Sequence, residues 1–322
     1  MRITVVRTLL MLAVGLIAAT VGARAVPEGP VLNRGRVPSA AHAGAQPRDA
    51  ASVLREMRAA LGGEAALDAI KSFTVRGSIK QTAGGFTKQL SIDLSVLLPD
   101  HFLDVRRDWN SAGPMPVDIT YYRGFRGDTL IRRTDSTMPF PPDPWPQTPA
   151  VIAQREREMT LRNKEDFARL VLILFGRSFS GYVLQFAYLG AEQREGRTIE
   201  VLEATGTDRY RMRLSVDAAT HLPAMIEYLA GQGVMVSTSS RVAVRGNEVV
   251  SQTPVSPPAP VDTTGLPMVE HRLVPSNFKV QGGLNWPHRL TVTVGADVVS
   301  QMDLGAFRLN PKLDARRFDI GR

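Results

Sequence analysis

Cysteine is absent from this chain of 322 residues. Without cysteine the chain forms no disulfide, binds no zinc through thiolates and carries no lipid on an N-terminal cysteine. We therefore expect a protein that is not lipid-anchored and that is stabilised by its hydrophobic core. A hydrophobic fraction of 43% over this length is ample for such a core.

Catalytic motifs are absent as well. The sequence contains no G-x-S-x-G, no H-E-x-x-H and no P-loop pattern. Its histidines stand far apart in the chain, at positions His42, His101, His221, His271 and His288. This pattern predicts no catalytic residues, no metal site and no cofactor, so we expect a protein that is not an enzyme. A hydrolase of an unrecognised type stays open as an alternative.

Long apolar runs are scarce. The one such run, from Thr8 to Val21, follows two arginines and precedes the small-residue sequence Ala23-Arg24-Ala25. These features are typical of a secretory signal peptide, here residues 1–25. The run is shorter than the ~20 residues that a spanning helix needs. We therefore predict export to the periplasm, with no stable membrane span after signal cleavage. An uncleaved membrane anchor is the alternative.

A concentrated basic patch is not visible in the sequence, despite a net charge of +8. The arginines are scattered among aspartate and glutamate residues, whereas nucleic-acid binding needs a dense cluster of positive charge. Together with export, this pattern excludes nucleic acid as a partner.

Composition divides the rest of the chain into segments. Residues 26–48 are rich in proline, glycine and alanine and have no apolar periodicity, which predicts a disordered linker. Residues 49–322 form a single predicted domain. Two proline-rich loops interrupt it, near residues 139–149 and 254–267.

Two helical regions are predicted within this domain. Asp49 has the features of an N-cap, and Gly62-Gly63 ends the helix that follows. A longer helical region runs from about Ala150 to Phe175, where Asn163 and Asp166 are spaced like a cap and its reciprocal acid, so a second helix is expected to begin there. The apolar stripe of this region is formed by Phe167, Leu170, Val171 and Leu174.

From Phe73 onwards the apolar period changes from 3.6 residues to 2. The clearest strand is Arg211–Val216. Its apolar residues Met212, Leu214 and Val216 are expected to point inward. About a dozen such strands, joined by tight turns, predict a mainly β fold with some helix. We expect an incomplete antiparallel β-barrel, or strongly curved sheet, with helices covering the concave face.

Five stretches in a fixed order resemble a known family. ALGGEAALDAI runs into SFTVRGSIK early in the chain, LGAEQREGRTIEVLEA and LSVDAATHLPAMIEY stand in the centre, and MDLGAFRLNPKLDARRFDI lies near the C-terminus. This order resembles the periplasmic lipoprotein localisation factor superfamily, in its outer-membrane lipoprotein-sorting protein branch. The resemblance implies an incomplete antiparallel barrel with a helical lid, and an interior that binds acyl chains or lipoproteins. The two proline-rich segments depart from the family pattern.

The strand pattern and the resemblance together predict a soluble carrier of a lipid or lipoprotein acyl chain, held in an apolar cavity and serving outer-membrane lipoprotein sorting. The alternative is a protein-interaction or envelope-sensing module on the same fold, with an envelope protein as its partner. The residues predicted to line the cavity are Leu90, Ile92, Leu94, Phe167, Leu170, Val171, Leu174, Ile199, Val201, Met212 and Leu214.

Overall fold

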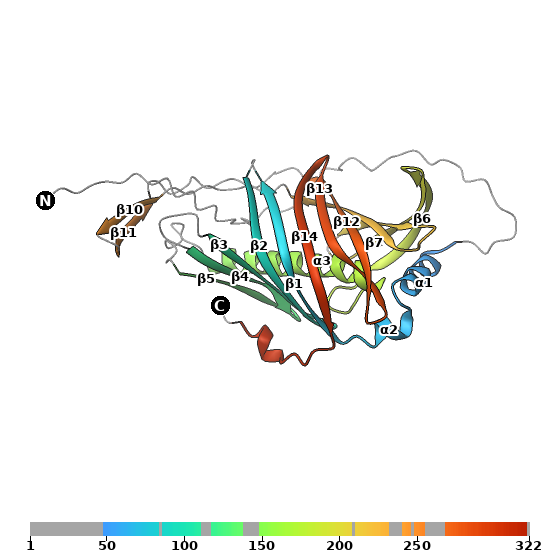
Figure 1. The fold of residues 1–322 in the computed structure, drawn as a ribbon, viewed down its shortest axis with the longest axis horizontal. Helices are drawn as coiled ribbons and strands as arrows, with labels where there is room; N and C mark the ends of the chain where they lie inside the picture. Colours follow the sequence, from blue (N-terminus) through green and yellow to red (C-terminus); the bar gives the residue numbers. More distant parts are fainter. Residues whose placement is uncertain are drawn as a thin grey trace.

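The computed structural model describes residues 48–83, 86–110, 117–137, 148–207, 210–231, 240–245, 248–254 and 268–320 (Figure 1). The predicted signal peptide lies outside the described residues, as do the linker up to residue 47 and most of both proline-rich loops. The predicted domain boundaries therefore stay predictions. No helix within the described ranges is both long enough and apolar enough to cross a membrane.

Twelve strands form one open sheet in the order β5-β4-β3-β2-β1-β14-β13-β12-β9-β8-β7-β6. Each neighbouring pair in the sheet is antiparallel, and the separate hairpin of β10 and β11 makes a second, two-stranded sheet. The strands are β1 (Ser72–Ala83), β2 (Phe86–Leu97), β3 (His101–Asn110), β4 (Val117–Arg126), β5 (Thr129–Ser136), β6 (Gln185–Arg194), β7 (Arg197–Thr205), β8 (Arg211–Asp217), β9 (Pro223–Gly231), β10 (Ser240–Arg245), β11 (Glu248–Pro254), β12 (Met268–Gln281), β13 (Leu284–Val294) and β14 (Asp297–Leu309). The predicted curved antiparallel sheet of about a dozen strands is confirmed.

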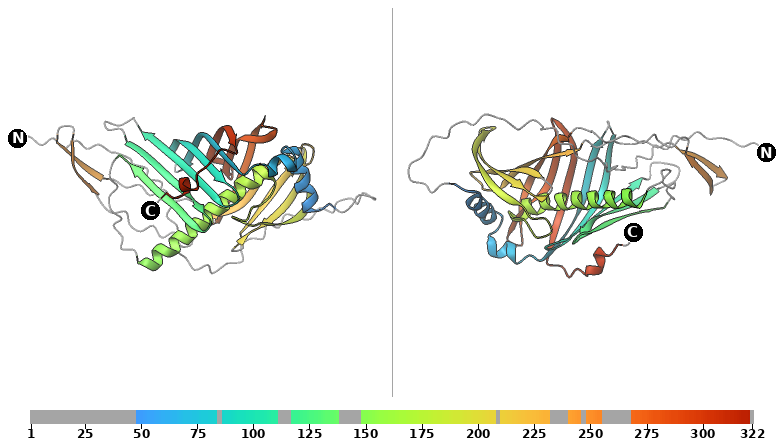
Figure 2. Two further views of the ribbon diagram at one scale, coloured as in Figure 1. Left: turned by 90° about the horizontal axis from the view of Figure 1, so that it is seen from below. Right: turned by 180° about the vertical axis from the view of Figure 1, so that it is seen from behind.

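The sheet is assembled from two sequential halves. Strands β1 to β5 follow one another as hairpins on one side of the sheet. On the other side, β6 to β9 and β12 to β14 form two such series, and β12 pairs with β9 to join them. The halves meet in the middle, where β1 pairs with β14 and Phe73 lies opposite Leu309. Figure 2 shows the long helix α3 (Pro149–Phe175) crossing the sheet, with one half-sheet on each side of the helix.

The first N-terminal helix begins and ends where the sequence predicts. In α1 (Ala50–Ala60), the Asp49 side chain accepts a hydrogen bond from the Ser52 amide, and the Ser52 side chain accepts one from the Asp49 amide. Gly62 follows with a φ of 131°, a value that other residues rarely adopt. The short helix α2 (Glu64–Asp68) then leads into β1.

Helix α3 corrects one prediction, because it continues without a break through Asn163. Asn163 caps nothing: its side-chain amide donates to the Gly124 carbonyl of β4 across 3.0 Å. The start of α3 is capped instead by Thr148, and its end by Gly176 with a φ of 61°. Burial of its second half against the sheet explains how a 27-residue helix is stabilised.

The inward faces are confirmed for β8, where Met212, Leu214 and Val216 are buried in the main core and Arg211 is exposed. A smaller cluster lies on the opposite face of the sheet, where Phe318 of the C-terminal 3-10 helix η2 (Ala315–Phe318) packs on Leu103 and its neighbours. Phe318 thus docks the C-terminal tail on the sheet.

Candidate functional site

The concave face beneath α3 collects most of the residues predicted to line a cavity. Those that join the single large core cluster are Leu90, Ile92, Leu94, Phe167, Leu170, Val171, Leu174, Met212 and Leu214. All of them are buried. They come from β2, α3 and β8, so the structure brings together segments that are far apart in the sequence.

Ile199 and Val201 are the exceptions, and their predicted face is wrong. Val201 lies directly opposite Ser215 in the β7–β8 pair, whereas Leu202 lies opposite Leu214. Residues opposite one another point to the same side of a sheet. Leu202 therefore faces α3 and Val201 faces away, with Ile199 on the same side as Val201. The sequence misleads here because β7 carries buried aliphatic residues on both faces.

The concave face is filled by side chains in this conformation. The Phe167 ring of α3 packs 5.4 Å from the Phe125 ring and 5.9 Å from the Phe102 ring, measured between centroids. Near the other end of the helix, Phe175 packs 5.5 Å from Trp286. Helix α3 thus occupies the apolar surface that the strands create.

A line of charged side chains interrupts this apolar surface. We call it the charged seam: Asp104, Arg106, Arg123, Asp166 and Arg169. Asp104 of β3 binds Arg106 at 2.9 Å and Arg123 of β4 at 2.7 Å. Arg123 also lies 3.6 Å from Asp166 of α3, which in turn pairs with Arg169 on the next turn. The seam therefore links the sheet to the helix.

Electrostatics favour the charged forms of Asp104 and Arg169 in the seam. Burial of Asp104 opposes its negative charge, but the neighbouring charges of Arg106 and Arg123 outweigh this and lower the pKa of Asp104. Burial likewise disfavours the cation of Arg169, yet the Tyr210 oxygen and Asp166 raise the pKa of Arg169. The paired, ionised Asp104 has no proton to give at neutral pH, so this residue suits an electrostatic contact rather than acid catalysis.

Arg169 connects the seam to aromatic residues of the other half-sheet. Its guanidinium donates to the Tyr210 hydroxyl and lies 4.0 Å from the centre of the Tyr228 ring. The His271 ring of β12 stacks on Tyr228 at 5.4 Å. Burial, and then the charge of Arg169, lower the pKa of His271, so this imidazole is neutral at pH 7. The Nε2 atom of His271 is buried and has no hydrogen-bond partner among the described residues.

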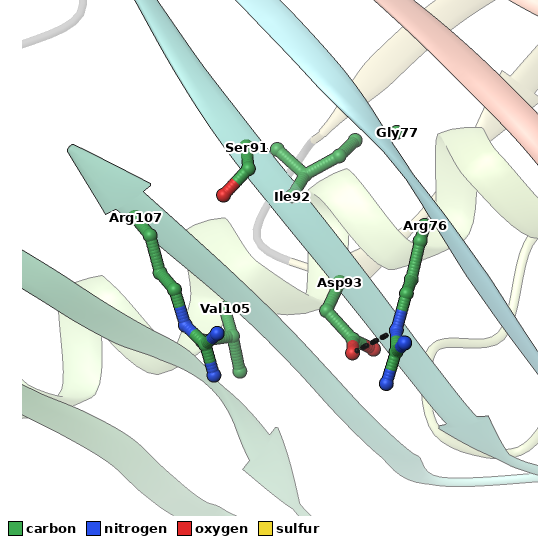
Figure 3. Close-up of a pocket in the computed structure, with 7 residues that line it drawn as sticks. All are labelled: Arg76, Gly77, Ser91, Ile92, Asp93, Val105 and Arg107. Carbon is green, nitrogen blue, oxygen red and sulfur yellow. Dashed lines mark hydrogen bonds and ion pairs between the residues drawn. The ribbon is translucent and has the colours of Figure 1, made fainter. Parts of the chain in front are cut away.

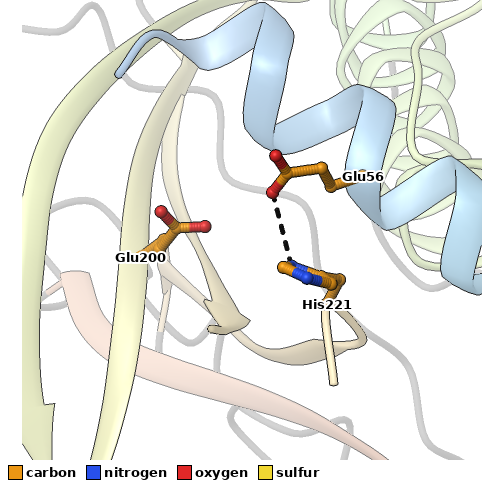
Figure 4. Close-up of side chains that lie close together, drawn as sticks. All are labelled: Glu56, Glu200 and His221. Carbon is orange, nitrogen blue, oxygen red and sulfur yellow. Dashed lines mark ion pairs between the residues drawn. The ribbon is translucent and has the colours of Figure 1, made fainter. Parts of the chain in front are cut away.

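A second charged cluster lies between α1 and β7. Glu56, Glu200 and His221 place three ligand-type atoms within 4.8 Å of one another (Figure 4). Arg48 already supplies the positive charge there, because its guanidinium donates to Glu56 at 2.7 Å and to Glu200 at 2.5 Å. This cluster ties the start of the described chain to the sheet.

Neither charged cluster is visible as a motif, because each draws residues from distant segments. A signal for the seam does exist in the strands. Asp104 and Arg106 continue the alternation that begins with the buried Phe102, and Arg123 is two residues from the buried Phe125. Charged residues in phase with buried aromatics indicate polar groups on a packed face.

The comparisons with known proteins bear on the fold. No family model matches the chain, and no curated protein matches it. Several solved structures resemble it, and three of them are described in turn. A LolA superfamily protein from Nitrosomonas europaea is 15% identical, covers 84% of this chain and 97% of its own, and has a TM-score of 0.43. A DUF1329 family protein from Desulfovibrio piger is 11% identical over 84% of this chain and 96% of its own, with a TM-score of 0.43.

A putative outer membrane lipoprotein-sorting protein domain from Vibrio parahaemolyticus is the third, at 13% identity over 83% of this chain and 95% of its own, with a TM-score of 0.41. The predicted resemblance is confirmed as a distant one. At such low identity the likeness concerns the fold alone.

Proposed function

We propose that this protein binds the acyl chain of a lipid or lipoprotein on the concave face of its sheet, with α3 as a movable cover. One observation carries the proposal: Arg169, a charged group, is buried between α3 and the sheet, with its guanidinium against the aromatic side chains of Tyr210 and Tyr228. An acyl ligand combines the same two features, a long apolar chain and one polar carbonyl group. Export to the periplasm belongs to this proposal.

The apolar part of the site supplies the affinity. Leu90, Leu94 and Leu214 belong to a continuous cluster that draws on both half-sheets. A chain that replaces α3 on this surface gains roughly 0.8 kcal/mol for each buried CH₂ group. Binding of this kind is non-directional, so it selects for chain length rather than for exact shape.

The charged seam makes the cover separable. A buried ion pair adds little net stability, because desolvation offsets the attraction between the charges. The seam residues regain water when α3 lifts, which lowers the cost of opening relative to a wholly apolar interface. The second half of α3 is buried, whereas Ile152 in its first turn is 41% exposed. We expect the helix to lift from its N-terminal end as far as Arg169, while the end at Gly176 stays in place.

The polar end of the ligand is placed by the aromatic side of the seam. Arg169 offers a cationic donor, and the neutral His271 beside Tyr228 has a buried ring nitrogen with no described partner. A carbonyl or carboxylate oxygen that reached Arg169 would form a charge-assisted hydrogen bond. The chain would then lie along the leucines and phenylalanines of the concave face.

The test combines a ligand series with a reversible lock. Fluorescence titration with fatty acids of increasing length should give affinity that rises with each CH₂ group. The ion pair of Lys164 on α3 with Asp128 at the β4–β5 turn, 2.5 Å apart, marks a place to lock the helix. Because the chain has no cysteine, a Lys164→Cys, Asp128→Cys variant can be bridged by a disulfide-containing bismaleimide without side reactions.

The bridged variant should lose binding, and reductant should restore it. The unbridged double variant is the matched control and should bind like the unmodified protein. Affinity that does not change with chain length, or binding that survives the bridge, would overturn the proposal.

A second candidate is a protein-interaction module, which the filled concave face favours. In that case α3 is permanent core, and an envelope protein is recognised elsewhere on the surface. Native mass spectrometry of protein purified from the periplasm distinguishes the two candidates. A co-purified amphiphile supports the acyl binder, and a co-purified protein chain without lipid supports the module.

A further inference from the structure

A pocket of about 240 Å³ lies on the sheet face opposite α3, across strands β1, β2 and β3. Its charged lining residues are Arg76, Asp93 and Arg107. They alternate along their strands with buried residues of the concave core, so their side chains leave the opposite face. Figure 3 shows Arg76 and Arg107 on either side of Asp93 and Val105, with both guanidinium groups extending in the same direction.

The pocket holds more positive charge than negative charge. The Nε atom of Arg76 lies 3.0 Å from Asp93, and Arg317 of η2 approaches the other oxygen of Asp93 at 3.5 Å. Asp93 is therefore shared by two guanidiniums. Within the described part of the chain, no acidic group forms an ion pair with Arg107. The guanidinium of Arg107 is thus left for a ligand.

Local backbone geometry keeps the Arg76 side of the pocket open. Between Val75 and Gly77 the β1–β14 register shifts, because Gly305 and Ala306 stand against the single residue Arg76. Such a bulge redirects the side chain beside it. Both opposing residues are small and exposed, so nothing bulky from β14 crowds Arg76. On the other side, Ser91 lies directly opposite Arg107 and adds a hydroxyl to the lining.

We propose that this pocket binds a phosphate-type oxyanion, with Arg107 and Arg76 as the charged donors and Ser91 as a neutral donor. Guanidinium groups match phosphate geometry because each presents two parallel N–H groups to two oxygens. Asp93 positions Arg76 but repels the anion, so the oxyanion is held chiefly from the Arg107 side. The proposal concerns the face opposite α3 and does not depend on acyl binding.

The experiment is a titration of the whole mature protein with inorganic phosphate at low salt, in which ³¹P NMR measures the binding. We expect saturable binding that weakens about tenfold in Arg107→Gln, which removes a charge-assisted hydrogen bond. Asp93→Asn should bind phosphate more tightly. Arg211→Gln is the matched control, because Arg211 is an exposed arginine on the same sheet face but on β8. It should leave the affinity unchanged.

If Arg107→Gln and Arg211→Gln weaken phosphate binding equally, the effect is one of overall charge and the proposed site is wrong. Phosphate binding that does not saturate would also overturn the proposal. Sedimentation with vesicles then identifies the source of the oxyanion. Binding to phosphatidylglycerol vesicles that is lost in Arg107→Gln and competed by phosphate assigns a lipid headgroup. Phosphate binding without vesicle binding assigns a free phosphate or phosphomonoester. The fatty-acid titration tests acyl binding on the concave face, whereas the phosphate titration tests the opposite face. Either proposal can therefore fail without the other.

Discussion

The indole Nε1 of Trp286 donates a hydrogen bond to the main-chain carbonyl of Leu174 across 2.9 Å. This contact joins β13 to the last turn of α3, where helix carbonyls have no partner within the helix. Both residues are fully enclosed by the core. The C-terminal end of α3 is therefore fixed to the sheet by a directional bond as well as by apolar packing.

Replacing Trp286 by phenylalanine should destabilise the protein. The Leu174 carbonyl would be buried without its donor, and the smaller ring would leave a cavity, for a combined loss of at least about 2 kcal/mol. Urea denaturation measures this loss. Val280→Ala, at a side chain that is 74% exposed, is the control and should change stability by less than about 0.5 kcal/mol. Equal midpoints for both variants would contradict the anchoring role of Trp286.

Strand β8 offers a test of face assignment. Leu214→Asp should prevent folding, because it buries a charge that has no partner in the apolar core around it. Arg211→Asp changes an exposed position on the same strand and should cost little, within about 0.5 kcal/mol. Thermal melts followed by circular dichroism compare the two. Similar melting curves would show that the assigned face is wrong.

Arg169→Met separates the two parts of the proposed ligand site. Methionine keeps an unbranched side chain but removes the charge, while Asp166 retains Arg123 as a partner. Affinity should still rise with fatty-acid length. The preference for a fatty acid over its methyl ester should disappear, because the charged donor for the carboxylate is gone. Fluorescence titration of both ligand series measures this.

The control for that experiment is Arg162→Met, which removes a charge from an exposed position of the same helix. It should keep both the length dependence and the preference for the acid. A preference for the acid that persists in Arg169→Met would exclude Arg169 as the group that contacts the ligand head.

The turn after β8 makes a prediction about pH. The Asp217 carboxylate accepts hydrogen bonds from the Thr220 amide at 2.9 Å and the Ala219 amide at 3.0 Å. These bonds, led by that from Thr220, lower the pKa of Asp217 in the folded state. A lowered folded pKa stabilises the protein above the unfolded value of about 3.9, and this contribution is lost as pH falls through the folded pKa.

Asp217→Asn keeps an oxygen acceptor but cannot ionise. The variant should be less stable than the unmodified protein at neutral pH, and the difference should shrink as the solution is acidified below about pH 4. Urea denaturation at both pH values measures the difference. A gap that stays constant with pH would show that ionisation of Asp217 does not contribute.

The contact of Arg48 with Glu200 can be measured by a double-mutant cycle. Glu200 is buried and Arg48 is partly exposed, so we expect a coupling energy of about 1 kcal/mol. The variants are Arg48→Gln, Glu200→Gln and the pair together, compared by urea denaturation. Additive effects would mean that Arg48 does not tie the start of the domain to β7.

Local patterns predicted the parts of this fold that depend on neighbouring residues. The alternation in Arg211–Val216 gave the correct inward face, and Asp49 and Gly62 gave the correct limits of α1. These features are decided within a few residues, by side-chain direction and by backbone conformation. The curved sheet follows from many strands that each have one apolar face.

The errors and omissions concern long-range pairing. The sequence pattern predicts the wrong face for Val201, because only the register of β7 with β8 identifies the side on which Val201 lies. Asn163 has the local form of a cap, but its side chain bonds β4 instead. The charged seam joins Arg123 to Asp166 across two elements that meet only in the folded chain. No spacing within one segment encodes such contacts.

The pairing of β1 with β14 has a consequence for how the protein is made. Ribosomes release the strands in order, and β1 is complete more than 200 residues before the partner that lies beside it. Until then each half-sheet ends in a bare edge, which invites pairing with other chains. Contacts between such distant segments also slow folding. A chain that terminates before Asp297 lacks β14. It therefore leaves the edges of β1 and β13 exposed and is prone to aggregate.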